Sequence, residues 1–228
     1  MSYAIIRNAK YKRENLKGIF RHNERRNKNY SNKNIDKELS YLNYSIKECK
    51  HTYEKEFDLI KEKYNLKGQV KSVSNIVCEY LITSDKGFFE KVGEQEGRRY
   101  FETAYKFVCE YKNLGEQYIL SAKVHMDEES PHMHLVFCPI NKEGKLSAKS
   151  ILGNQKSLSE WQTRYYKFMH ERWNELERGQ SAQITKRKHI PTWLFKMADN
   201  LDYLYNKLSN VIENINLNPA FSPDIFDY

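Results

Sequence analysis

The spacing of apolar and polar residues along this chain predicts strands and long amphipathic helices in turn. Residues 3–7 and 75–83 have the β-branched and aromatic composition of strands. Apolar residues recur at helical spacing in a short helix or turn within 15–29, which a basic loop follows. Residues 84–89 are expected to form a turn. Longer helices are predicted over residues 45–71, 95–112 and 157–178, and a final helix near 192–215.

A β-hairpin is predicted over residues 117–139. Tyr118–Val124 is a strand-like run, the polar stretch 126–131 has the composition of a loop, and a second apolar run follows. Strands separated by long helices, with at least one antiparallel hairpin, predict an α+β domain with a central, mainly antiparallel β-sheet packed by α-helices. We expect this domain to span residues 1–190. Residues 191–228 would be a C-terminal helix and tail, or the start of a truncated helical region.

Three of the seven histidines lie within ten residues, in His125-Met-Asp127-Glu128-Glu-Ser-Pro131-His132-Met-His134. Residues two apart on a strand share one face, so His132 and His134 point the same way. The hairpin would bring His125 across from them. Three neutral imidazoles can hold a divalent cation and leave positions open for water or substrate, as in catalytic metal sites. The alternative is a set of solvated histidines on the polar face of a sheet.

Composition is that of a globular protein with a polar surface. The chain of 228 residues is 39% hydrophobic and 14% aromatic, and its mean hydropathy is −0.84. No apolar run is as long as a membrane span, and the N-terminal residues lack the apolar core of a signal peptide. The four cysteines are scattered without a Cys-x-x-Cys pair, which is typical of reduced thiols in the cytoplasm.

Positive charge is concentrated at the N-terminus. Residues 1–34 hold ten Lys and Arg and two Asp and Glu, so their net charge of +8 equals that of the whole chain. The remaining residues therefore sum to zero. This asymmetry is typical of a segment that faces a polyanion, and nucleic acid is the first candidate. A solvated basic surface is the other interpretation.

Several sequence blocks occur here in an order that is known from one family. They are Phe20-x-His22-Asn23-Glu24-Arg25, then Leu42-Asn43-Tyr44, then Cys78-Glu-x-Leu-Ile-Thr-Ser-Asp85, then the histidine motif. With them, nearly all of residues 1–180 resembles the N-terminal relaxase domain of plasmid mobilisation and recombination proteins of the MobM/Pre type. The resemblance implies a bacterial, metal-dependent enzyme that nicks one DNA strand at a plasmid origin of transfer. It also implies covalent attachment to the 5′ end, with single-stranded and hairpin origin DNA as the partner.

The resemblance also assigns roles to residues. It implies that His125, His132 and His134 hold the metal and that His22 is the nucleophile. Imidazoles alone would suit zinc or another transition ion. In the family the ion is manganese or magnesium, and we favour Mn²⁺ because it accepts both imidazole and phosphate oxygen. The sequence does not indicate an oligomeric state.

Neighbouring residues are candidates for supporting roles. Glu128 is expected to orient or deprotonate His22, and Asp127 to hold a metal-binding histidine by a hydrogen bond. Tyr44 is the alternative nucleophile, or a side chain that stacks on DNA bases. Contacts to DNA phosphates or bases are expected from Arg21, Asn23, Arg25, Arg26 and Tyr44.

Two other functions are compatible with the same residues. A non-catalytic protein that binds an origin or its own promoter would need the basic segment but not the metal. A rolling-circle replication initiator would use the same histidine core with Tyr44 as the nucleophile.

Overall fold

The computed structural model describes residues 2–30, 32, 34–111, 114–179, 201 and 204–210. The chain divides into two compact units, residues 1–179 and 180–228. The predicted boundary at residue 190 lies outside the described residues. The first unit contains the strands β1 (Ser2–Tyr3), β2 (Ile5–Lys12), β3 (Tyr44–Lys47), β4 (Asn75–Thr83), β5 (Ile119–His125), β6 (His132–Phe137) and β7 (Leu176–Glu177). Its helices are α1 (Arg13–Asn23), α2 (Tyr53–Lys63), α3 (Lys86–Tyr111), α4 (Ala148–Leu152) and α5 (Gln155–His170), with short 3₁₀ helices η1 (Lys37–Leu42) and η2 (Glu116–Tyr118).

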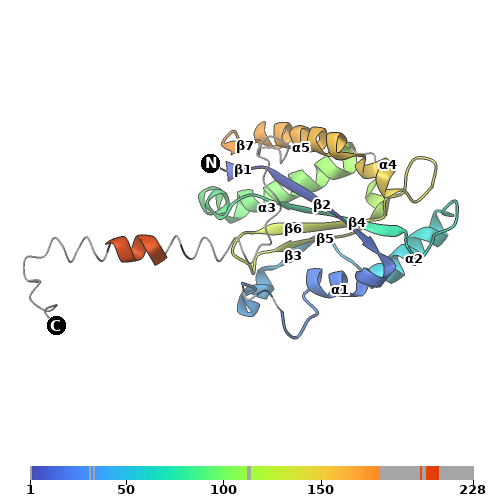
Figure 1. The fold of residues 1–228 in the computed structure, drawn as a ribbon, viewed down its shortest axis with the longest axis horizontal. Helices are drawn as coiled ribbons and strands as arrows, with labels where there is room; N and C mark the ends of the chain where they lie inside the picture. The colour runs from blue at the N-terminus through green and yellow to red at the C-terminus, as the bar shows by residue number, and fades with distance from the viewer. Residues whose placement is uncertain are drawn as a thin grey trace, which may run out of the picture. The chain divides into compact units, whose positions relative to one another are not determined.

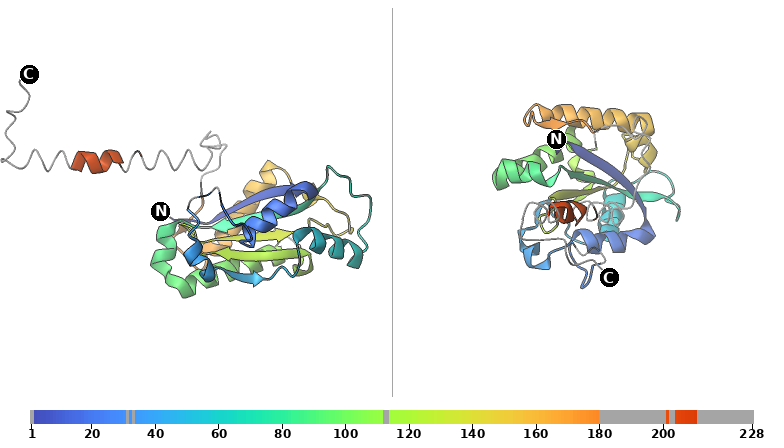
Figure 2. Two further views of the ribbon diagram at one scale, coloured as in Figure 1. Left: turned by 90° about the horizontal axis from the view of Figure 1, so that it is seen from below. Right: turned by 60° about the vertical axis from the view of Figure 1, so that its left-hand side comes forward.

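Five strands form one sheet in the order β2-β4-β6-β5-β3, and every neighbouring pair in it is antiparallel. The short strands β1 and β7 pair in parallel beside it. Figure 1 shows α3 and α5 on one face of the sheet and α1 and α2 on the other, and Figure 2 shows the same layers from two further directions. The predicted α+β fold with a central antiparallel sheet is confirmed.

The two-residue period of β6 separates its side chains between these layers. Met133, Leu135 and Phe137 are fully buried in the core that includes α3 and α5. Each such side chain contributes roughly 1.5–3 kcal/mol by its removal from water. The intervening residues, His132, His134 and Val136, lie on the opposite face. There Val136 belongs to a second core with Leu16 of α1 and Phe57 of α2. The packing of the core therefore fixes which face carries the histidines.

The predicted hairpin is confirmed, and its register is the one that a histidine site needs. β5 and β6 are antiparallel neighbours in which His125 lies directly opposite His132. β6 is the central strand of the sheet, so His134 also lies between Leu81 on β4 and Lys123 on β5.

The predicted helix over residues 45–71 was too long. Its first part is the edge strand β3, because Tyr44 and Ser45 pair with β5. The helix α2 begins only after Thr52, whose hydroxyl accepts a hydrogen bond from the backbone N–H of Lys55. Its apolar positions match the expected helical period, but the strand could not be seen without its partner.

Two other predicted boundaries were also wrong. The turn expected at 84–89 is shorter, because Asp85 caps a helix by accepting a hydrogen bond from the N–H of Phe88. This helix, α3, kinks at Gly93, where φ is 78°. The helix expected over 157–178 is α5, which ends at His170. Most of the segment near 192–215 is outside the described residues, of which 201 and 204–210 are helical.

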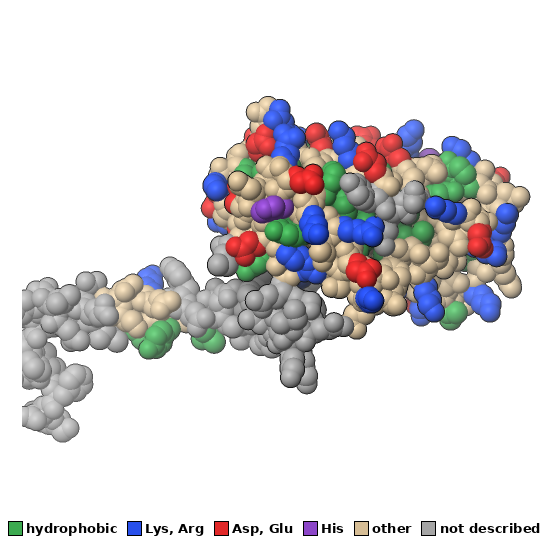
Figure 3. Space-filling model, turned by 90° about the horizontal axis from the view of Figure 1, so that it is seen from above, with side chains coloured by type: hydrophobic (Ala, Val, Ile, Leu, Met, Phe, Trp, Pro, Cys, Tyr) green, Lys and Arg blue, Asp and Glu red, His purple; other side chains and the backbone are tan. Residues whose placement is uncertain are grey.

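The surface of the first unit on the α5 side carries mixed charges. Figure 3 shows Lys and Arg side chains interspersed with Asp and Glu on this face. Such a mixture does not attract a polyanion as a patch of one sign does. Within the part of the chain that the structure describes, no helix is long and apolar enough to cross a membrane.

Candidate metal centre

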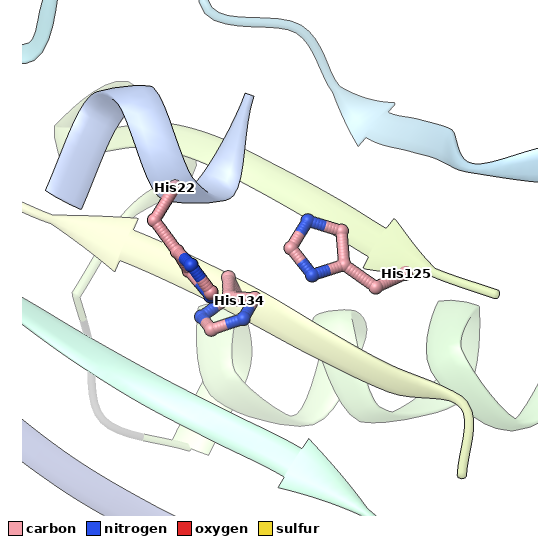
Figure 4. Close-up of side chains that lie close together, drawn as sticks. All are labelled: His22, His125 and His134. Atoms are coloured by element: carbon pink, nitrogen blue, oxygen red, sulfur yellow. The ribbon is translucent and has the colours of Figure 1, made fainter. Parts of the chain in front are cut away.

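Four histidines lie close together on the face of the sheet that α1 covers. His125 ends β5, while His132 and His134 lie on β6 and His22 lies in the last turn of α1. The ring centroids of the three strand histidines are 4.7–5.1 Å apart. His22 is 5.5 Å from His134 and 5.9 Å from His125 by the same measure. Figure 4 shows the side chains of His22, His125 and His134 pointing toward one another.

Each strand histidine is held through one ring nitrogen. Nε2 of His125 lies 2.7 Å from the carbonyl oxygen of Asn23, and Nδ1 of His132 lies 3.0 Å from that of Ser130. Nδ1 of His134 lies 2.8 Å from Oε1 of Glu79. A carbonyl or carboxylate oxygen can only accept, so each of these nitrogens carries the proton. When such a ring is neutral, its other nitrogen has an unshared lone pair.

Among the described residues, the protein does not supply hydrogen-bond donors for these lone pairs. Nδ1 of His125 and Nε2 of His132 are 3.3 Å apart, although neither has a proton to share. Nε2 of His134 is buried without a hydrogen-bond partner among the described residues. Burial and the charge of His134 lower the pKa of both His125 and His132, in the latter to about 4, so the rings stay neutral at pH 7. Two nitrogens at this separation fit ligands about 2.1 Å from one shared cation.

Two overlapping sets of ligand atoms are close enough to hold a metal ion. The atoms of His22, His125 and His134 lie within 4.8 Å of one another. Those of His125, Glu128 and His132 do so as well. His125 belongs to both sets, which places the candidate cation site beside this residue. The rings of the three predicted ligands lie close together, but neither set contains all three. His22 stands in place of His132 in the first set, and Glu128 stands in place of His134 in the second.

The carboxylate that orients His134 is Glu79, which sequence reasoning missed. It is buried on β4 and accepts hydrogen bonds from His134, from Nδ2 of Asn23 at 2.8 Å and from the hydroxyl of Tyr11 at 2.7 Å. Burial alone would raise the pKa of Glu79, but His134 and these hydrogen bonds lower it to about 2. A single acidic residue inside the apolar run Ile76–Ile82 was the available signal, since buried charges need partners.

Asp127 does not hold a histidine as we expected. Its fully buried carboxylate accepts hydrogen bonds from Arg25 at 2.6 and 2.9 Å, from Ser40 at 2.6 Å and from Asn43 at 2.7 Å. Burial opposes its ionisation, but these donors lower the pKa of Asp127 below its ordinary value. The amide oxygen of Asn43 also accepts from the N–H of Met126. Through these hydrogen bonds, Asp127 links the loop of the histidine hairpin to the segment that follows α1.

Glu128 lies beside the histidines but is not hydrogen-bonded to His22. Its oxygens accept from Arg25 and Asn32, each at 2.8 Å, and Oε1 lies 3.8 Å from Nε2 of His132. Burial disfavours its charge, whereas His132, Arg25 and His22 favour it and lower its pKa. The direct contact expected from the sequence is absent, but Glu128 and His22 affect one another electrostatically.

The residues that were expected to contact DNA divide into two groups. Arg21 and Arg26 are exposed and remain candidates. Asn23 is buried and links α1 to both His125 and Glu79, so its side chain already has partners within the protein. The side chain of Arg25 is only 8% exposed because Asp127 and Glu128 surround it. Its backbone adopts a φ of 51°, which turns the chain back toward the hairpin.

His22 and Tyr44, the two candidate nucleophiles, lie in different environments. Burial lowers the pKa of His22, and the charges of His134 and Arg25 lower it further. His22 is therefore neutral and able to donate a lone pair at pH 7. The hydroxyl of Tyr44 is buried with no hydrogen-bond partner in the described structure, and its ring packs under the guanidinium of Arg98. Burial raises the pKa of Tyr44, which disfavours the nucleophilic phenolate.

Arg25→Ala is expected to lower the free energy of unfolding by about 3 kcal/mol, because it leaves two carboxylates without their shared cation. Urea denaturation measures this change. Arg26→Ala is the matched control, and it should leave stability unchanged while it reduces the salt dependence of single-stranded DNA binding. If Arg25→Ala instead changed only the salt dependence, Arg25 would be a phosphate contact after all.

Known proteins are similar to this chain over most of its length. The family model described as "Plasmid recombination enzyme" matches residues 1–197. The chain is 40% identical over 192 residues to plasmid recombination enzyme type 1 from Staphylococcus aureus, which covers 83% of this chain and 47% of the relative. It is 38% identical over 202 residues to a plasmid recombination enzyme from Streptococcus agalactiae, covering 87% and 40%. The chain thus spans about half the length of the curated relatives that it matches.

Solved structures of a MobM relaxase domain are similar over the same region. One, Mn-bound at pH 6.8 and in complex with plasmid pMV158 oriT DNA, superposes with a TM-score of 0.76 at 37% identity. The match covers 86% of this chain and 98% of that domain. Another, bound to a 26-nucleotide oriT DNA, has a TM-score of 0.68 at 33% identity.

Proposed function

Since this chain belongs to the plasmid recombination enzyme family, we propose that it is a relaxase domain that nicks one strand of plasmid DNA at an origin of transfer. The observation that carries the proposal is the set of histidine lone pairs on one face of the sheet, with His22 beside them. A protein that only binds DNA does not need three imidazoles oriented toward one another. The proposed substrate of the relaxase domain is origin DNA that contains a single-stranded segment and a hairpin.

The proposed metal ligands are His125, His132 and His134. Their donors fit a divalent ion that tolerates nitrogen, and Mn²⁺ does so better than Mg²⁺, which prefers oxygen. The Mn-bound state of the similar MobM domain supports this choice. When bound, the cation would neutralise negative charge that develops on the phosphoryl oxygens. The contacts of Glu79, Asn23 and Ser130 fix the three rings in advance of binding.

The proposed nucleophile is His22. A neutral ring nitrogen attacks the scissile phosphorus, a P–N bond forms, and the P–O3′ bond breaks. The 3′ oxygen leaves and takes up a proton from water, and the attacking ring loses its remaining N–H proton to solvent. The 5′ phosphate stays on the protein. Because the phosphoramidate keeps the energy of the broken bond, the free 3′ hydroxyl can reverse the step and reseal the strand.

The groups around His22 would support this reaction. Glu128, held in place by Arg25 and Asn32, favours positive charge on the ring as it attacks. Arg21 and Arg26 are exposed near His22 and would hold phosphates of the strand without reading its sequence. Asp127 and Asn43 would keep the histidine hairpin in register with α1.

Incubation with a supercoiled plasmid that carries an inverted repeat from beside the gene tests this function. With Mn²⁺ we expect open-circular DNA with protein attached to its 5′ end, and none with a chelator. No nicked product with any divalent ion would leave the non-catalytic DNA-binding protein as the better interpretation.

Glu79→Gln is expected to weaken Mn²⁺ binding by about 10–100-fold, since loss of a carboxylate partner lowers the basicity of the ligand histidine. The amide retains an oxygen for the hydrogen bond from His134. Isothermal titration with Mn²⁺ measures the effect. Asp58→Asn, which removes an exposed carboxylate paired with Arg13, is the matched control and should bind Mn²⁺ normally. Equal affinities of the two variants would count against the role of Glu79.

A further inference from the structure

A pocket of about 360 Å³ opens between the loop of the histidine hairpin and the first half of α3. Glu128 forms part of its wall and also lies 3.8 Å from His132, so the pocket and the candidate metal centre share this side chain. The rest of the wall comes from the first half of α3, from Leu42 and Tyr44, and from the loop of the hairpin. Its size is at the lower end of the range of about 300–1,000 Å³ for small-ligand pockets.

We infer that this pocket receives one unstacked nucleobase of the DNA strand whose phosphate lies at the histidine cluster. The inference rests on the proposed function, and it names a contact that would read the sequence of the strand. Apolar side chains that can cover the faces of a planar ring dominate the wall: Leu42, Tyr44, Phe89, Phe101, Met126 and Pro131. Stacking of a base on aromatic residues is the usual basis of single-strand binding.

The charges of the pocket disfavour a phosphate as its occupant. Its two cations, Lys86 and Arg98, are paired with Glu90 and Glu94 at 3.5 and 3.3 Å. Two more carboxylates, Glu128 and Glu129, also line it. Carboxylates accept hydrogen bonds from the amino group of cytosine or adenine, whereas thymine presents a carbonyl oxygen at the same place. We therefore expect the pocket to prefer a base with an exocyclic amino group.

The surface next to the pocket suits a continuing single strand. Tyr41 and Leu42 on η1 are 78% and 39% exposed, although both are large and apolar. Leu42 also lines the pocket, so η1 forms its rim. A neighbouring base can stack on Tyr41 while the strand continues toward the histidines.

Gly97 offers a way to close the pocket without disturbing the histidines. It is buried in α3 and lines the pocket, and an added Cβ would meet only Cδ1 of Phe89, at 3.6 Å. Its backbone is helical, so a larger residue is compatible with the conformation. Gly97→Leu therefore fills the pocket. Gln95→Leu adds the same side chain at an exposed position of the same helix and is the control.

The test measures binding of oligo(dC) and oligo(dT) of equal length to the full chain by fluorescence anisotropy, without metal. We expect the wild type and Gln95→Leu to bind oligo(dC) about tenfold more tightly than oligo(dT). Gly97→Leu should lower this ratio to less than about twofold, with its main loss on oligo(dC). In addition, 5-iodocytosine in the oligonucleotide should photocrosslink to Tyr44 or Phe89.

Absence of a preference in the wild type, or the same preference in Gly97→Leu, would overturn the inference. Crosslinks that map only to residues outside the pocket would do so as well. Nicking of the origin plasmid is scored separately in the wild type. Its absence would argue against the proposed function alone, because the binding measurement does not depend on the cleavage reaction.

Discussion

Replacement of His134 with asparagine should abolish both Mn²⁺ binding and DNA nicking. The Nδ2 amide can replace Nδ1 as the donor to Glu79, so the buried carboxylate keeps a partner, but no nitrogen remains in the place of Nε2. Loss of one of three ligands should raise the Kd for Mn²⁺ by more than about 100-fold. Nicking should fall by at least about 10³-fold, because charge stabilisation worth several kcal/mol is removed.

His134→Ala is the companion variant, and its comparison with His134→Asn separates metal binding from folding. The alanine leaves Glu79 buried with one partner fewer and should also lower the free energy of unfolding, by about 1–3 kcal/mol. Urea denaturation and Mn²⁺ titration of both variants measure the two effects independently. Normal Mn²⁺ affinity in a folded His134→Asn would remove His134 from the ligand set.

His22→Ala should lower the rate of nicking by at least about 10⁴-fold, as loss of the nucleophile does in other enzymes that form a covalent intermediate. Binding of Mn²⁺ should change by no more than about threefold if the strand histidines alone hold the ion. Nicking of a supercoiled origin plasmid and Mn²⁺ titration are the two measurements. The wild-type adduct should carry an acid-labile P–N bond at residue 22, which mass spectrometry after mild acid treatment detects.

Tyr44→Phe is the control for this experiment and should nick normally, since the hydroxyl of Tyr44 is buried and its pKa is raised. An acid-stable adduct at Tyr44 would instead identify a tyrosine nucleophile. A large loss of Mn²⁺ affinity in His22→Ala would show that His22 is a metal ligand. The close approach of His22 to His125 and His134 makes this comparison necessary.

Local sequence patterns were sufficient for the elements that carry the histidines. The strand at 75–83 was predicted with the bounds that it has, and the hairpin placed His125 opposite His132 because a two-residue period and a polar loop fix both face and register. The helix that holds His22 was also expected near its position. These features depend on residues close together in the sequence.

Only the tertiary structure decided what surrounds those histidines. Glu79 orients His134 from another strand, and Asn23 links α1 to both His125 and Glu79, so each contact joins segments at least fifty residues apart. Arg25 lies in the basic segment and was expected to contact DNA. In the structure its side chain is buried and forms an ion pair with Asp127. The sequence by itself identified the histidine cluster and the basic segment. Packing alone determined the partners of each charge, because burial makes an unpaired charge costly and depends on every neighbouring element.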